Sequence, residues 1–261
     1  MSDRLFIGID VGTQGTKVIV YSEEQKIIIA SSYSKHEIIK NNQGKREQKP
    51  EWWINAARTC LNAVLSNVDK QRVVAIGVSG QQHGCVPLDE NGDVIRPAKL
   101  WCDIETAEEC DIMTERLGGL ENVVKLIGNS IAAGFTASKI MWLRRHEPEN
   151  YMKARMFLLP HDYMNYWLTG NYVTDMGDAS GTAYFDVRNR KWCKEVLDVI
   201  DEERDWEQCL PKILAFDEKA GIIRKEIAKE FGLPESVQVS SGGGDNMMAA
   251  IGTGNVFPGV I

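Results

Sequence analysis

The chain has 261 residues, 43% of them hydrophobic, and a formal net charge of −7, which is ordinary for a soluble globular protein with a sizeable core. Its 30 Lys and Arg residues form no basic block, which argues against a nucleic-acid-binding surface. No run of about eighteen apolar residues predicts a membrane span, and the start lacks the features of a signal peptide, so we expect a cytoplasmic protein.

The first part of the chain predicts three short strands joined by tight turns. Alternating apolar residues indicate a strand at 5–11, and turns separate it from strands at 16–21 and 26–33. Consecutive strands of this kind predict an antiparallel meander. Pro50 then stands at the favoured first position of a helix whose apolar residues recur at helical spacing up to Leu65.

Helices and strands alternate along the rest of the chain, which predicts an α/β layered domain. We expect a strand at 73–79, mainly helices over 105–168, and turns with short strands over 170–192. Further helices are expected at 195–212, 222–231 and 247–251, with a strand at 238–241. A helix exit at 252–254 and a turn at 257–259 would lead into a strand at 260–261, and we expect the natural protein to continue beyond it.

The first candidate site is the segment DVGTQGTK, residues 10–17. Two strands joined by a turn with two glycines direct backbone N–H groups into one concavity, which suits an anion. Asp10, at the strand end, could hold Mg²⁺ through water. The spacing is not that of a Walker A loop, and an ordinary hairpin turn is the alternative. The candidate phosphate-binding residues are Gly12, Thr13, Gln14, Gly15, Thr16 and Lys17.

The second candidate site is the segment GGGDN, residues 242–246. Three consecutive glycines lose much chain entropy on folding, and their usual reason is a close approach of the backbone to another group. Asp245 then falls at a helix start, where N–H groups and the helix dipole favour its ionised form. The alternative is a helix-capping aspartate after a flexible turn.

A third candidate site, GQQHG at residues 80–84, follows the carboxyl end of a strand, where ligands of open α/β sheets bind. Gln82 and His83 can donate and accept hydrogen bonds, as recognition of a polyhydroxylated substrate requires. A loop histidine can equally be an ordinary surface residue. The neighbouring residues 77–80 are one residue short of a GxSxG elbow, so a serine hydrolase is discounted.

Taken in order, these segments resemble the FGGY family of carbohydrate kinases. Residues 8–13 and 242–246 are similar to the start of that family and to its catalytic aspartate region, and residues 134–149 (GFTASKIMWLRRHEPE) resemble its first signature. Residues 47–53 and 178–182 (DASGT) also fit, so the similarity extends over the whole chain. Residues 80–84 and 100–103 (LWCD) are most similar to the xylulokinase branch. The chain departs from common family residues at Gln82, Glu105 and Ser138.

The resemblance implies an α/β, actin-like fold with a ribonuclease-H-like core, a mixed sheet and flanking helices. Residues 1–261 would be the first of two such domains, and the C-terminal nucleotide-binding domain would lie outside the chain. The implied activity is ATP-dependent phosphorylation of a ketopentose, first of all D-xylulose, with ribulose, L-xylulose or another ketose as alternatives. An alternative of another class is a non-catalytic, sugar-binding actin-like module.

The resemblance also implies roles for individual residues. Asp245 would be the catalytic base and, together with Asp10, would hold Mg²⁺. The residues implied to bind the substrate are Gln82, His83, Trp101, Asp103, Asp245 and Asn246. Sugar and ATP are the expected partners, without nucleic acid or membrane, and a homodimer is left open. We expect this half alone to be inactive as an enzyme.

Overall fold

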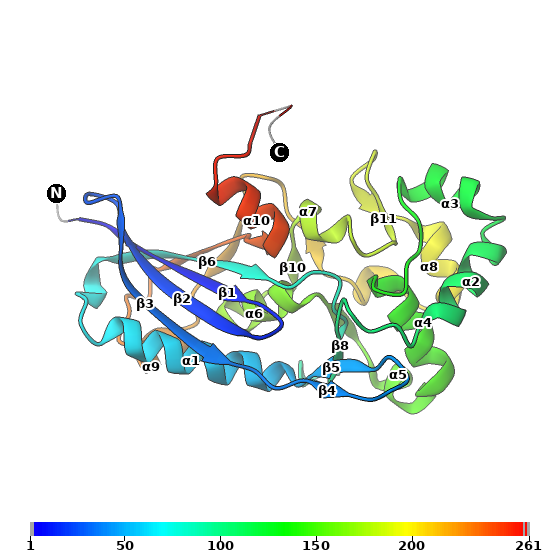
Figure 1. Cartoon of the computed structure of the whole chain (residues 1–261), viewed down its shortest axis with the longest axis horizontal. Helices are drawn as coiled ribbons and strands as arrows, with labels where there is room; N and C mark the ends of the chain where they lie inside the picture. The colour runs from blue at the N-terminus through cyan, green and yellow to red at the C-terminus, as the bar shows by residue number, and fades with distance from the viewer. Residues whose placement is uncertain (1–2, 258, 260–261) are drawn as a thin grey trace.

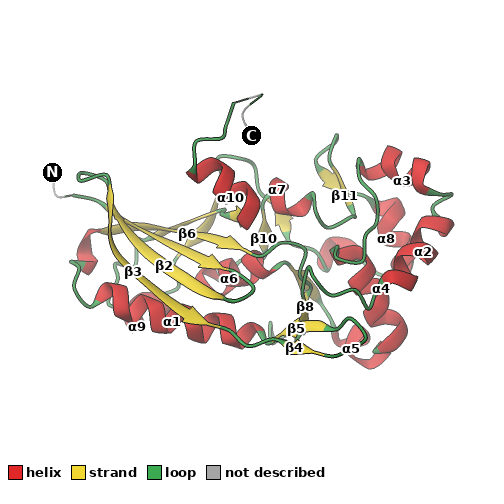
Figure 2. Cartoon of the chain, in the orientation of Figure 1, coloured by secondary structure: helices red, strands yellow, loops and turns green. Residues whose placement is uncertain are grey.

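The predicted meander forms one side of a seven-stranded mixed sheet (Figures 1 and 2). The computed structural model describes residues 3–257 and 259. β1 (Leu5–Val11) pairs antiparallel with β2 (Gly15–Ser22), which pairs antiparallel with β3 (Ile27–Lys35). The alternation read from the sequence is confirmed, because every second residue of β1 is buried in the core.

The centre of the sheet is β6 (Val73–Gly80), which runs parallel to β1. On its other side β6 pairs first with β15 (Gln238–Ser240) and then with β16 (Gly243–Gly244), both parallel. β14 (Lys219–Ile222) pairs antiparallel with β15. The carboxyl ends of β1, β6 and β16 therefore meet at the same edge of the sheet.

Helices cover both faces of this sheet. α1 (Pro50–Leu65) packs against β2 and β3 and contacts α6 (Pro160–Thr169) and α9 (Lys225–Phe231). The predicted helix start at Pro50 is confirmed, and its core face is buried apart from the half-buried Trp52. α10 (Asp245–Gly252) lies on the opposite side of the sheet in Figure 1.

A second hydrophobic cluster joins the helices on the right of Figure 1. They are α2 (Ala107–Arg116), α3 (Leu120–Ile127), α4 (Thr136–His146), α5 (Pro148–Lys153) and α8 (Lys194–Asp201). The remaining helical elements are α7 (Met176–Ala179) and the 3₁₀ turns Lys70–Arg72 and Trp206–Gln208. The helix predicted over 195–212 is wrong beyond Asp201, because Trp206 turns into the core and begins a short 3₁₀ turn there.

Short strands connect the two clusters. β4 (Ile39–Lys40), β5 (Arg46–Gln48) and β8 (Ala98–Lys99) form a three-stranded sheet, and β7 (Val86–Leu88) pairs with β9 (Met156–Leu158). β10 (Val173–Thr174) pairs with β13 (Lys212–Ile213), and β11 (Phe185–Asp186) with β12 (Lys191–Trp192).

The C-terminal part of the chain differs from the sequence prediction in one helix start. The helix predicted at 222–231 begins only at Lys225, because Ile222 still belongs to β14. The strand predicted at 260–261 lies outside the described residues. The helices in the described part of the chain lack the length and apolar composition of a membrane span.

Candidate functional site

The two carboxylates singled out in the sequence line one cavity. Asp10 lies in β1, and Asp245 begins α10 directly after β16. The cavity, of about 630 Å³, lies between the sheet and α10, and Lys17, Ser79 and Asn246 also line it. Segments 235 residues apart in sequence thus meet because β1 and β16 flank the same central strand.

Asp10 is exposed to this cavity, and a residue of the neighbouring strand holds its carboxylate. The Ser79 hydroxyl, on the neighbouring strand, donates a hydrogen bond of 2.8 Å to Asp10 Oδ1. Lys17 faces Asp10 across the β1–β2 pair and is also exposed. A carboxylate and an ammonium group at the mouth of one cavity suit a cation and an anion bound side by side.

Asp245 is half-buried, and its environment differs from the sequence expectation. Burial raises the pKa of the Asp245 carboxyl, and the negative charge of Asp10 raises it further. The backbone N–H of Asn246 donates to Asp245 Oδ1 at 2.8 Å and acts in the opposite direction. The expectation that the helix start would favour the ionised form is therefore outweighed, and Asp245 is a better proton acceptor than expected.

The glycines before Asp245 allow three parts of the chain to pack closely, as predicted. Gly242 has φ +66°, and a Cβ there would lie 2.2 Å from the Val78 carbonyl oxygen. A Cβ on Gly244 would lie 2.6 Å from Gln82 Cγ. Asn246 Nδ2 donates to Gln82 Oε1 at 2.9 Å, which links the start of α10 to the loop after β6.

His83 is held in a left-handed backbone conformation, with φ +62°. Its carbonyl oxygen accepts hydrogen bonds from Lys139 Nζ at 2.5 Å and from Thr136 Oγ1 at 3.2 Å. The imidazole lies 4.6 Å from the Phe135 ring and against Gly181. Burial, and next the Lys139 charge, lower the pKa of His83 to about 4, so the ring is neutral and offers one donor and one acceptor.

Trp101 is half exposed and belongs to a chain of hydrogen bonds that fixes the β1–β2 turn. Its Nε1 donates to Thr13 Oγ1 at 2.9 Å, and Thr13 Oγ1 donates to Gln81 Oε1 at 3.0 Å. Gln81 Nε2 in turn donates to Gln48 Oε1 at 3.0 Å. The Thr13 hydroxyl is thus already used as both donor and acceptor inside the protein.

Other groups of the predicted phosphate turn are also bonded internally. Thr16 is fully buried, and its hydroxyl lies 2.9 Å from His36 Nε2. The Gly12 N–H donates to the Gly15 carbonyl at 3.0 Å. A phosphate that used these groups would have to displace those bonds, whereas the exposed Lys17 can reach it directly.

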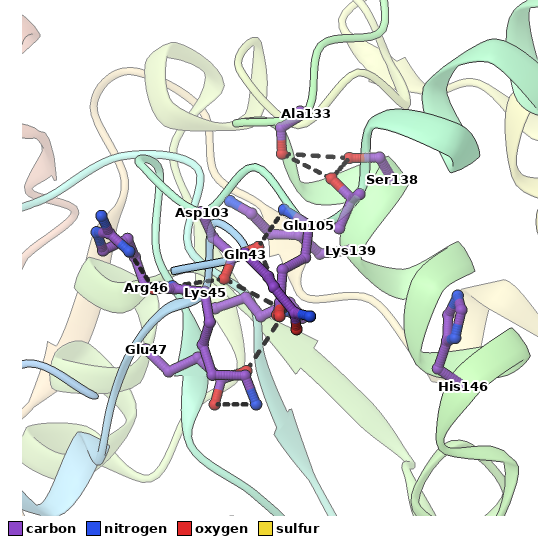
Figure 3. Close-up of polar contacts among 12 residues, drawn as sticks. Gln43, Lys45, Arg46, Glu47, Asp103, Glu105, Ala133, Ser138, Lys139 and His146 are labelled. Carbon is purple, nitrogen blue, oxygen red and sulfur yellow. Dashed lines mark hydrogen bonds and ion pairs between the residues drawn. The ribbon is translucent and has the colours of Figure 1, made fainter. Parts of the chain in front are cut away.

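Asp103 lies away from the cavity. It is completely buried and accepts the backbone N–H groups of Arg46 at 2.7 Å and Glu105 at 3.1 Å (Figure 3). It also lies 3.3 Å from Lys99 Nζ. Glu105 lies 2.6 Å from the same ammonium, and Glu47 lies 3.4 Å from it. In this structure Asp103 is bonded to groups inside the protein, and its substrate contact stays a prediction.

Comparison with known proteins identifies the family of this domain. Residues 5–252 match the model of the FGGY family of carbohydrate kinases, N-terminal domain. The chain belongs to this family. The predicted fold class is confirmed, because the mixed sheet and flanking helices are those of FGGY sugar kinases of known structure.

Individual FGGY relatives are similar over almost all of this chain. It is 48% identical to a xylulose kinase of Haemophilus influenzae over 98% of its length, and 37% identical to one of Escherichia coli over 97%. A solved structure named a xyloylose kinase, from Brucella ovis, is 34% identical over 98% of the chain with a TM-score of 0.91. The chain spans about half the length of each, namely 53%, 50% and 52%.

Three residues beside this FGGY site were not identified from the sequence. Ser79 ends the strand predicted at 73–79 and lies in the segment that falls short of a hydrolase elbow, and neither pattern indicates a contact with Asp10. Lys139 lies inside the signature-like segment, where a charged residue next to the apolar residues 140–143 is the available signal. His161 is buried behind the glycine turn, and no local pattern marked it.

Proposed function

We propose that this chain is the N-terminal, sugar-binding half of an ATP-dependent kinase that converts D-xylulose to D-xylulose 5-phosphate. One observation carries the proposal: Asp10 and Asp245 line the same cavity, with Lys17 beside one and Asn246 beside the other. The names of the relatives point to xylulose as the sugar. A second domain outside the chain would bring the nucleotide, and a kinase that uses ATP would work in the cytoplasm.

In this proposal Asp245 accepts the proton of the C5 hydroxyl group and orients its oxygen for in-line attack on the γ-phosphorus of ATP. A bond forms between that oxygen and phosphorus, the bond to the β–γ bridging oxygen breaks, and ADP leaves. The raised pKa of Asp245 favours its proton-accepting role at neutral pH. Positioning should still contribute most, because the transition state of phosphoryl transfer is loose.

The donor groups in the cavity fit a hard divalent cation. Carboxylate oxygens are the ligands that Mg²⁺ takes in proteins, so Asp10 and Asp245 would hold it, each directly or through water. Bound Mg²⁺ would neutralise charge on the phosphate oxygens. Lys17 would contact the outer phosphates, while Gln82, His83 and Trp101 would bind the sugar.

Two measurements test this proposal. The first is calorimetry of this chain with D-xylulose, ribulose and L-xylulose, where tightest binding of D-xylulose is expected. The second is phosphorylation by the full-length kinase, where Asp245→Asn should lower kcat by at least ~10²-fold. Asp217→Asn is the matched control, since Asp217 is exposed and does not line the cavity.

Each outcome separates the proposal from its rivals. Preference for another ketose would keep the chemistry and change the substrate. Sugar binding without any phosphoryl transfer by the full-length protein would favour the non-catalytic module. Near-normal turnover by Asp245→Asn would reject the role of Asp245.

A further inference from the structure

His161 lies directly behind the turn that leads to Asp245, and both of its ring nitrogens contact oxygen atoms of the protein. Its side chain is completely buried in α6. Nδ1 lies 2.9 Å from Asp178 Oδ2 and 3.3 Å from Asp162 Oδ1. Nε2 lies 2.9 Å from the backbone carbonyl oxygen of Ser241.

These contacts favour one protonation state of the ring. A carbonyl oxygen can only accept a hydrogen bond, so Nε2 must carry a hydrogen. Nδ1 faces two carboxyl groups, and a hydrogen there is needed for an attractive contact with an ionised Asp178. A ring with hydrogens on both nitrogens is an imidazolium cation, and Asp178 and Asp162 are its counterions.

The direction of the His161 pKa shift agrees with this geometry, while burial raises the pKa of the Asp178 carboxyl and His161 lowers it. Burial disfavours the charged ring, but Asp162, Asp178 and then Asp175 raise the pKa of His161 to about 10. Burial raises the pKa of Asp162 to about 7, against the opposing effect of His161. Asp175 caps α7 through the Gly177 N–H at 2.6 Å, so it is held next to this group.

The His161 ring is hydrogen-bonded to the glycine turn at the Ser241 carbonyl group, and this group has little room to move. The Ser241 carbonyl oxygen also accepts a hydrogen bond from Asn165 Nδ2 at 2.7 Å. A Cβ on Gly242 would lie 3.3 Å from His161 Cδ2, and one on Gly80 would lie 2.8 Å from His161 Cβ. The turn is therefore packed between β6 and His161, three residues before α10 begins.

We propose that His161, held as an imidazolium by Asp178 and Asp162, is a positioning residue for Asp245. It fixes the Ser241 carbonyl and with it the glycine turn that directs the Asp245 carboxylate into the cavity. The catalytic part of this inference rests on the proposed function of Asp245. His161 itself touches neither the cavity nor a substrate in this arrangement, because it is not among the cavity-lining residues.

The charge of His161 can be measured without any activity assay. The chain has only 4 histidines, so ¹⁵N spectra of the imidazole groups are simple to assign with single His→Gln variants. At about pH 8.5, well above the usual histidine range, His161 should still show two protonated nitrogens. A neutral ring with one protonated nitrogen at this pH would overturn the proposal.

The positioning role needs its own readout. In this chain, His161→Gln should accelerate amide hydrogen exchange over residues 241–246, and the exposed-histidine control His146→Gln should not. In the full-length kinase, His161→Gln should lower kcat by about 10²-fold and change the sugar KM little, as for a misplaced catalytic group. Asp178→Asn should act in the same direction, and His161→Lys, which keeps a cation, should recover part of kcat.

The results distinguish this inference from the proposed function. If the wild-type kinase turns over no ketose, the proposed function fails, while hydrogen exchange and ¹⁵N spectra still decide whether His161 fixes the turn. If folded His161→Gln keeps both the wild-type exchange over 241–246 and the wild-type kcat, the positioning role is refuted.

Discussion

Replacement of Lys139 by methionine tests how a buried ammonium group beneath the proposed sugar site changes the pH dependence of stability. Lys139 is 1% exposed, and its ammonium bonds to the carbonyl oxygens of His83 and Gly134, each at 2.5 Å. Burial lowers the pKa of Lys139 from 10.5 to about 7, although the negative charge of Asp103 acts in the opposite direction. Methionine keeps an apolar stem of similar size and removes the titrating group.

The sign of the pH effect follows from proton binding in the two states. Between pH 7 and 10.5 the unfolded chain carries the Lys139 proton and the folded chain does not. The free energy of unfolding therefore rises with pH, by about 1.4 kcal/mol per pH unit from this group. Below pH 7 the buried Lys139 charge lowers the free energy of unfolding by its full amount, about 5 kcal/mol. This loss of stability decreases as the pH rises and is gone above about pH 10.5.

The Lys139→Met variant should lack this rise. It also leaves two carbonyl oxygens without their donor, at a cost of about 1–3 kcal/mol each if they stay dry. The free energy of unfolding of wild type minus that of the variant should grow by roughly 3 kcal/mol over two pH units. Other titrating groups contribute to both proteins and largely cancel in this difference.

Urea unfolding followed by tryptophan fluorescence measures this difference. Titrations at about pH 7.5, 8.5 and 9.5 cover the range in which the Lys139 contribution changes most steeply. Lys153→Met is the control, since Lys153 is exposed, and its curve should follow that of the wild type. A gap between wild type and Lys139→Met that stays constant across this range would refute the reasoning.

Three further substitutions have defined outcomes. His83→Ala should raise the sugar KM and change kcat little, measured in the full-length kinase; a fall in kcat alone would contradict a binding role. Gly181→Ala would place a methyl group 2.1 Å from His83 Cε1, so it should weaken sugar binding by calorimetry, and its effect should not add to that of His83→Ala. Lys99→Met should lower the free energy of unfolding by about 3–5 kcal/mol, because Glu47 and Asp103 lose a buried cation; unchanged urea unfolding would contradict this.

Local patterns predicted the framework of the fold. The strand at Leu5–Val11 was readable because one face of β1 is buried, which imposes a period of two on the sequence. The helix from Pro50 was readable because its core face repeats at helical spacing. The helix predicted over 195–212 was too long, because its end depends on where Trp206 packs, and that contact is made across the chain.

The parts of the site that lie at strand ends beside glycine turns could be predicted from the sequence. The parts that depend on contacts with residues far away in the sequence could not. Asp10 and Asp245 were marked by glycine turns at strand ends, which are visible locally. The buried states of Thr16 and Asp103 were not visible, since they depend on His36 and Lys99. The contact of His161 with a carbonyl 80 residues away left no trace in the sequence around it.

The double pairing of β6 with β15 and β16 has a consequence for how the reaction centre is prepared. The turn carrying Asp245, the proposed proton acceptor, is anchored to this strand at both ends, and the loop that would meet the sugar continues from the same strand. The Asp245 carboxylate and the sugar hydroxyl group would thus be positioned by the same rigid strand. Their alignment would be set when the chain folds and would not have to form again in each turnover. We then expect any motion that assembles the complete active site to occur in the proposed nucleotide-binding domain, which would bring the phosphoryl group.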